Sequence, residues 1–126
     1  MVGFGDVYVG IAKLALAITE AHSLKEKRMV LRRIKDRVRE RLQVTMNEVG
    51  EQDIWQRAEL GCAVVSADRG KALELIDEVV RVAMSAGGAE VTSIAKEVQT
   101  FDAPGEPVAD KASAADDFVV PEEWKQ

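Results

Sequence analysis

The stretch Ser23–Leu42, SLKEKRMVLRRIKDRVRERL, has the pattern of an amphipathic helix. Ser23 is a candidate N-cap, and Glu26 three residues later completes a capping box, which marks the first turn. Apolar residues recur through the stretch at helical spacing and predict which side of the helix is buried. These residues are Leu24, Leu31, Ile34, Val38 and Leu42.

The sequence on either side of this helix predicts four strands and a second helix. The strands are expected at Val7–Thr19, Val44–Val49, Ala58–Ser66 and Glu90–Phe101. In the first strand, alternation with period two places these residues on one face: Tyr8, Leu14, Leu16 and Ile18. The second helix is expected at Lys71–Met84, with Asp68 as its N-cap and Gly87 and Gly88 ending it. Its expected inward-facing residues are Leu73, Ile76, Val80 and Ala83.

The order strand, helix, strand, strand, helix, strand contains two β-α-β units. Right-handed crossovers place both helices on one face of a four-stranded antiparallel sheet. The expected fold is therefore an α+β, ferredoxin-like βαββαβ sandwich.

Charge divides the chain into two parts. The 126 residues have a net charge of −5, but residues 102–126 hold seven acids and two bases, so residues 1–101 are neutral. All three prolines also lie after residue 101. We expect a ferredoxin-like domain at 1–101 and a disordered acidic tail at 102–126. The tail ends in the apolar segment DFVVPEEW, which is either an ordinary terminus or a docking peptide.

Two stretches together resemble the YlxP-like family of small bacterial proteins, a domain of unknown function. They are the helix at Ser23–Leu42 and NEVGEQDIWQRAELGCAVVSAD at Asn47–Asp68. The resemblance covers residues 9–100 and implies a ferredoxin-like fold. It also implies a gene neighbourhood among translation and transcription factors, and hence a connection to RNA or the ribosome. The family has no established activity or catalytic residues to carry over, and the acidic tail after Thr100 departs from its usual length.

Five basic side chains share one arc of the predicted first helix, beside its apolar stripe. The acids Glu26, Asp36 and Glu40 are expected on the far flank of the helix. Basic residues three and four apart on one face match a run of contacts to a phosphate backbone. The alternatives are a solvated face, pairing with Glu48, Glu51 or Glu59, or an acidic protein partner. The expected RNA contacts are Lys25, Arg28, Arg32, Lys35 and Arg39, with Arg57 flanking them.

The sheet face away from the helices is expected to be apolar and to lack aromatic residues on the first and third strands. On the first strand it should carry Val7, Val9, Ile11, Lys13 and Ala15, and on the third Arg57, Glu59, Gly61, Ala63 and Val65. Recognition of bases by stacking on this face is therefore not expected. An apolar face of this kind favours a homodimer packed sheet on sheet, with cover by Phe118, Val119 and Trp124 of the tail as the alternative.

No pattern typical of an enzyme or of a metal site is found. The single cysteine, Cys62, alternates with apolar residues in a strand, and the single histidine, His22, precedes a helix cap. The carboxylates of the loop around Asp53 are read as turn residues rather than a Mg²⁺ site. No apolar run approaches the roughly 20 residues of a membrane helix, and the first ten residues lack the features of a signal peptide. We expect a cytoplasmic protein without catalytic residues, metal or cofactor.

These observations favour a non-enzymatic protein that binds RNA, ribosomal RNA foremost, through its basic first helix and supports ribosome assembly or translation. The alternative is a homodimeric protein-interaction module whose basic helix docks an acidic protein or the chain's own acidic tail.

Overall fold

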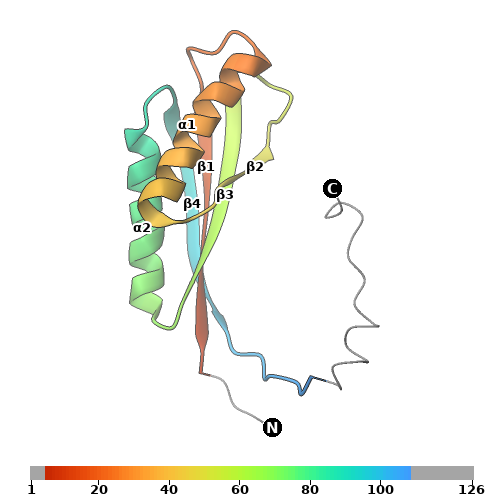
Figure 1. Ribbon diagram of the computed structural model, residues 1–126, viewed down its shortest axis with the longest axis vertical. Helices are drawn as coiled ribbons and strands as arrows, with labels where there is room; N and C mark the ends of the chain where they lie inside the picture. The colour runs from red at the N-terminus through yellow and green to blue at the C-terminus, as the bar shows by residue number, and fades with distance from the viewer. Residues whose placement is uncertain (1–4, 109–126) are drawn as a thin grey trace. The chain divides into compact units, whose positions relative to one another are not determined.

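The structure, a computed structural model, describes residues 5–108, and residues 1–4 and 109–126 lie outside the described part. The apolar segment that ends the tail is therefore outside it as well. One compact unit, Asp6–Phe101, contains the helices and strands of the described residues (Figure 1). In chain order they are β1 (Val7–Ala17), α1 (Leu24–Leu42), β2 (Asn47–Gly50), β3 (Arg57–Ser66), α2 (Arg69–Ser85) and β4 (Glu90–Phe101).

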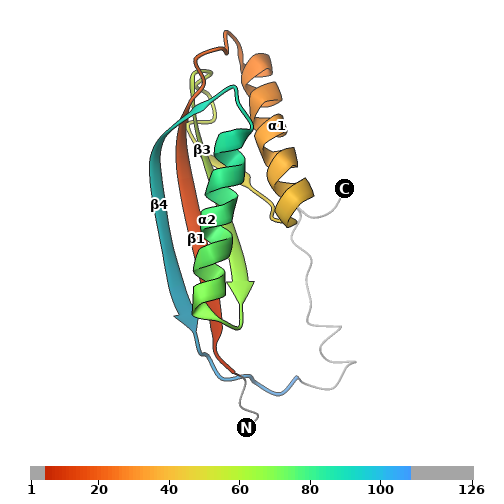
Figure 2. The same ribbon diagram turned by 90° about the vertical axis from the view of Figure 1, so that its left-hand side faces the viewer.

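The four strands form one antiparallel sheet in the order β2-β3-β1-β4. Both helices lie on the same side of this sheet and leave its other face open, as Figure 2 shows. The predicted ferredoxin-like βαββαβ sandwich is therefore confirmed. β1 and β3 are the two central strands, and every second residue along most of their length is buried. β2 is a short strand at the edge of the sheet.

Local hydrogen bonds explain why α1 begins and ends where it does. The Ser23 hydroxyl accepts from the Glu26 amide at 3.1 Å, so Ser23 is the N-cap as predicted. The Glu26 carboxylate accepts from the amide of His22, one residue before the N-cap, so the second bond of the predicted capping box is displaced by one residue. At the other end Gln43 adopts a left-handed conformation (φ 57°), and its N–H donates to the Arg39 carbonyl at 2.8 Å. This is the αL type of helix termination, achieved without glycine.

The hydrophobic core lies between the helices and the even-numbered side of β1. The predicted residues Leu14, Leu16 and Ile18 are buried there, whereas Tyr8 is only half-buried. On α1, the central residues of the predicted stripe are buried with Val30, but Leu24 is 36% exposed at the first turn. The stripe also contains one charged residue, Lys27, which is 1% exposed.

Several sequence-based details of the elements are wrong. Leu73 is 42% exposed, and α2 buries Ala72, Val79 and Val82 in addition to the other predicted residues. On a helical projection these buried residues form one face, and Leu73 lies beyond its edge, roughly 90° from its centre. β2 begins at Asn47 rather than Val44, because the chain before it is buried without pairing to β3. β1 ends at Ala17 rather than Thr19.

The open sheet face carries the odd-numbered residues of β1 and β3, as predicted. Pairing with β4 adds residues to that face that were not considered from the sequence. Phe101 lies opposite Val7, and Glu97 lies opposite Ile11. The apolar part is thus concentrated at the Val7 end, where Val65 is 68% and Phe101 58% exposed. The prediction that β1 and β3 present no aromatic side chain there is confirmed, and Phe101 of β4 is an aromatic residue that the sequence reading missed.

Gly10 marks the closest approach of β1 to α2. A Cβ atom at Gly10 would lie 2.6 Å from Ile76 Cγ1, 3.0 Å from Val64 Cγ2 and 3.1 Å from the Ala72 carbonyl oxygen. Gly10→Ala is therefore expected to overpack this contact and to lower the free energy of unfolding by about 1–3 kcal/mol, measured by urea denaturation. The control is Gly5→Ala, because a Cβ there meets nothing within 4 Å. Equal stability of the two variants would contradict the expectation.

Candidate nucleic-acid interface

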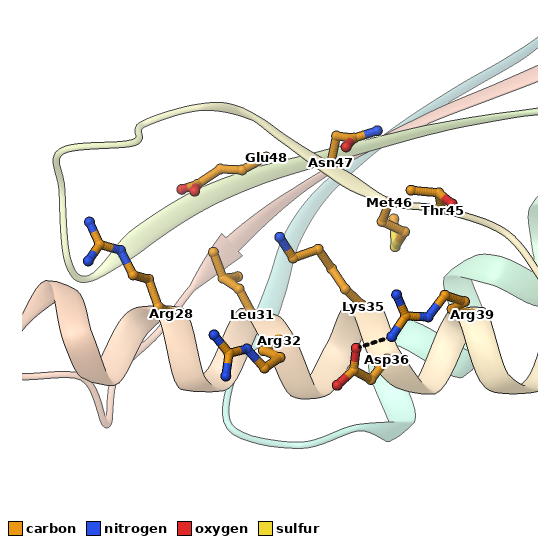
Figure 3. Close-up of a pocket in the computed structure, with 10 residues that line it drawn as sticks. All are labelled: Arg28, Leu31, Arg32, Lys35, Asp36, Arg39, Thr45, Met46, Asn47 and Glu48. Atoms are coloured by element: carbon orange, nitrogen blue, oxygen red, sulfur yellow. Dashed lines mark hydrogen bonds and ion pairs between the residues drawn. The ribbon is translucent and has the colours of Figure 1, made fainter. Parts of the chain in front are cut away.

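A groove of about 410 Å³ runs between α1 and the segment that leads into β2. The α1 side of the groove is basic and the opposite side is polar (Figure 3). Its lining residues are Arg28, Leu31, Arg32, Lys35, Asp36 and Arg39 from α1, and Thr45, Met46, Asn47 and Glu48 from the opposite segment.

The groove collects four of the six residues predicted from the sequence. Arg28, Arg32, Lys35 and Arg39 lie along its α1 wall, and in Figure 3 Lys35 points from the helix toward the Asn47 and Glu48 segment. The other two lie outside the groove. Lys25 is exposed on the first turn of α1, and Arg57 begins β3 on the open face of the sheet.

The expectation that no acid shares this arc is wrong. Asp36 lines the groove, and its carboxylate accepts from the Arg39 guanidinium at 2.8 Å. A helical projection places Asp36 on the flank, but a side chain three residues away is within reach of a long arginine. Since both partners are exposed, this ion pair contributes little to stability. It nevertheless neutralises the Arg39 end of the groove in part.

Three groove cations have no carboxylate partner within the described part of the chain. Arg28, Arg32 and Lys35 form no ion pair within 4.0 Å there. Pairing of the basic arc with Glu48, Glu51 or Glu59 was an alternative, and no such ion pair is found among residues 5–108. Glu48 does form an ion pair, but its partner is Lys27. The positive charge of these three residues is therefore available to a ligand.

Lys27 is the buried cation beneath this surface. Its ammonium lies 2.8 Å from Glu48 Oε2 and donates to the carbonyls of Glu51 at 2.6 Å and Ile54 at 2.7 Å. The Gln52 carbonyl, at 3.3 Å, is a weaker acceptor. Glu48 Oε2 is itself buried and receives no aligned hydrogen bond from the described residues, so its charge is offset by the ammonium alone. A buried charge needs such a set of partners, because moving it out of water is costly.

The loop that Lys27 holds is the connection from β2 to β3. Glu51 lies in the left-handed region (φ 60°), a conformation that few residues other than glycine adopt, and its carbonyl also accepts from the Ile54 amide. Three carbonyls of this turn thereby converge on one ammonium. Sequence reasoning missed Lys27, although its position seven residues before Ile34 places it on the buried side of the helix.

Comparison with known proteins identifies a family whose matched region includes both α1 and the β2–β3 loop. Residues 9–96 match the family described as "Protein of unknown function (DUF503)". The chain belongs to this family.

A curated relative, "Uncharacterized protein YlxP" from Bacillus subtilis (strain 168), is 48% identical over 61 residues, which are 48% of this chain. The chain spans 66% of that relative's length. The resemblance to YlxP-like proteins is thus confirmed, and both stretches that carry it meet at Lys27: the helix supplies the ammonium and the loop supplies the carbonyls.

Two solved structures are similar at low identity. The de novo designed protein Foldit4 is 17% identical, covering 78% of this chain and 98% of its own, with a TM-score of 0.39. A C-terminal segment of the alpha subunit of aIF2 from Pyrococcus abyssi is 15% identical, covering 79% of this chain and 52% of its own, with a TM-score of 0.38. At these scores neither similarity bears on function.

Other candidate chemistry has a structural explanation. Cys62 is buried in β3, and burial raises the pKa of its thiol, which keeps it protonated and unreactive. His22 contacts the Trp55 ring edge-on, with ring centroids 6.1 Å apart. Residues 5–108 contain no cluster of three or more His, Cys, Asp or Glu that would hold a metal ion. Within the same residues, neither helix is long and apolar enough to cross a membrane.

The Lys27 contacts predict a large difference between two nearby lysines. Lys27→Met leaves the Glu48 carboxylate and the loop carbonyls without their partner, and we expect the free energy of unfolding to fall by about 3–5 kcal/mol. Adding Glu48→Gln should recover part of this loss, because it removes the uncompensated charge. Urea denaturation measures each effect.

The matched control is Lys25→Met, which removes the same charge from an exposed position on the same helical turn. It should change stability by no more than about 0.5 kcal/mol. If Lys27→Met were as mild as Lys25→Met, the anchoring role of Lys27 would be wrong.

Proposed function

We propose that this protein is a non-enzymatic, cytoplasmic RNA-binding protein whose α1 groove holds the phosphate backbone of RNA, ribosomal RNA foremost, in support of ribosome assembly or translation. The observation that carries the proposal is the run of Arg28, Arg32 and Lys35, which have no ion-pair partner among the described residues and lie along one groove wall. Phosphate oxygens are the natural partners of such cations, and neutralising them releases counterions.

The details of the groove suggest how RNA would lie in it. Arg39 exchanges Asp36 for a phosphate at one end, and Lys25 extends the row by one turn at the other. Arg57 lies on a different face of the domain, so it serves at most as a flanking contact. Thr45 and Asn47 on the opposite wall offer hydroxyl and amide groups to sugars. These side chains would recognise the backbone and the shape of the RNA and make no contact with base edges. We therefore expect weak preference for sequence.

The proposal predicts a steep dependence of RNA affinity on salt. The five phosphate contacts of this row correspond to a slope of log K against log salt of about −3.5 for a single strand. Arg28→Glu combined with Arg32→Glu should abolish binding of RNA by the full-length protein in fluorescence anisotropy, because it replaces attraction with repulsion at the centre of the groove.

The control has the same change of charge on the other helix. Lys71→Glu combined with Arg81→Glu alters two exposed residues of α2 outside the groove, and it should retain most of the affinity. Equal losses in the two double variants would mean that binding follows net charge only. Retained binding by the Arg28 and Arg32 variant would refute the proposed interface.

A second proposal is a homodimeric protein-interaction module, favoured by the apolar end of the open sheet face. Val65 and Phe101 are exposed there beside Val7 and Val9, a cluster typical of a surface that is covered by a partner. In this proposal two copies pack sheet on sheet, and the basic helix docks an acidic protein. RNA and an acidic protein would compete for the same groove.

The dimer is tested by mass in solution. Sedimentation equilibrium of the full-length protein at micromolar concentration should give twice the chain mass, and Val65→Asp should give the monomer. Met84→Asp, at an exposed apolar position on α2, is the control and should leave the mass unchanged. A monomeric wild type would refute the dimer without affecting the RNA proposal.

A further inference from the structure

Trp55 is a large aromatic side chain in the β2–β3 loop, and its ring contacts His22, which precedes the N-cap of α1. It follows Ile54, whose carbonyl is bound by Lys27, and Lys27 directly precedes Arg28 in α1. Figure 3 shows the chain leaving Glu48 and turning at the Arg28 end of the groove. Trp55 is 39% exposed, so much of its ring remains outside the core.

The backbone on both sides of Trp55 is fixed. On one side the Ile54 carbonyl accepts from the Lys27 ammonium at 2.7 Å, and the Ile54 amide donates to the Glu51 carbonyl at 3.2 Å. On the other side the Gln56 carbonyl accepts from the Ile18 amide at 2.8 Å. A side chain mounted on such a backbone loses little further freedom when it binds a ligand, which is the advantage of preorganisation.

The ring of Trp55 is partly open to solvent and is not enclosed in the core. His22 contacts Trp55 edge-on, at an interplanar angle of 67°, and both side chains are exposed. The ring thus lies at the N-terminal end of α1, the helix whose next turns carry the unpaired cations Arg28, Arg32 and Lys35. An aromatic ring together with a row of cations is the combination found where single-stranded nucleic acids bind, since bases stack on the ring while phosphates lie on the cations.

We propose that Trp55 is a stacking platform for one base of a single-stranded RNA whose phosphates follow the α1 groove. The inference rests on the proposed RNA function and names its substrate class. Duplex RNA hides its bases inside the stack and offers none to Trp55, so an unpaired strand is the ligand that uses both features. Loss of one stacked base corresponds to about a 5- to 100-fold loss of affinity.

The test uses the fluorescence of Trp55 in the full-length chain. The chain has two tryptophans, so all variants carry Trp124→Phe, which leaves Trp55 as the one reporter. A short unstructured RNA should quench this fluorescence in a saturable way. The same RNA as a duplex, and inorganic polyphosphate, which has no bases, should bind with little quenching.

Three variants separate stacking from charge. Trp55→Leu should weaken binding of the unstructured RNA about 5- to 100-fold in anisotropy while leaving the salt slope and the polyphosphate affinity unchanged. Trp55→Phe keeps an aromatic face and should fall between wild type and Trp55→Leu, which guards against an effect of misfolding. Phe101→Leu, at an exposed aromatic residue on the open sheet face, is the matched control and should bind like wild type.

The outcomes distinguish this inference from the proposed function. RNA binding with the expected salt slope, but without quenching and without an effect of Trp55→Leu, overturns the stacking platform and leaves the groove proposal intact. Equal affinity for duplex and unpaired RNA in all variants overturns it in the same way. Absence of any RNA binding overturns both.

Discussion

The groove beside α1 and the β2–β3 loop both depend on the ion pair and hydrogen bonds of Lys27. An ammonium buried in the helix layer is tolerable only when carboxylate and carbonyl oxygens replace the water it has lost. Glu48, Glu51 and Ile54 supply those oxygens, and each is thereby held at a defined position. The partners come from β2 and from the loop that follows it, so one side chain of α1 fixes the opposite wall of the groove and the backbone beneath Trp55. A hydrophobic residue at this position would pack, but it would leave the loop without its anchor.

The distribution of charge around α1 follows from this arrangement. Glu48 also lines the groove, but its carboxylate pairs with the buried lysine and with none of the groove cations. The positive potential of Arg28, Arg32 and Lys35 is therefore preserved at the surface by an ion pair beneath it. Asp36 offsets the charge of Arg39 only at one end, and because that pair is exposed it contributes little to stability.

The groove and the open sheet face are separate surfaces, and they differ in chemistry. The groove lies between α1 and the segment entering β2, in the helix layer, and its chemistry is polar and basic. The apolar cluster around Val65 and Phe101 lies on the opposite side of the sheet, at the Val7 end. A protein that dimerised through the sheet would keep both grooves accessible, so RNA binding and dimerisation are compatible.

Periodicity and capping signals in the sequence determined the fold. α1 spans Leu24–Leu42 behind its predicted N-cap Ser23, and β4 spans Glu90–Phe101 as predicted. The basic arc of α1 was also visible as a pattern in the sequence. These features depend on neighbours in the chain, which a sequence displays directly. The sequence also indicates that Lys27 is buried, because this residue lies on the same side of the helix as the apolar residues. The tertiary structure alone decided what Lys27 binds, that Asp36 enters the groove and that Phe101 lies beside Val7. Those contacts join residues whose distance depends on strand order, register and the path of the β2–β3 loop, and no local pattern encodes where a loop carbonyl will meet a side chain more than twenty residues away.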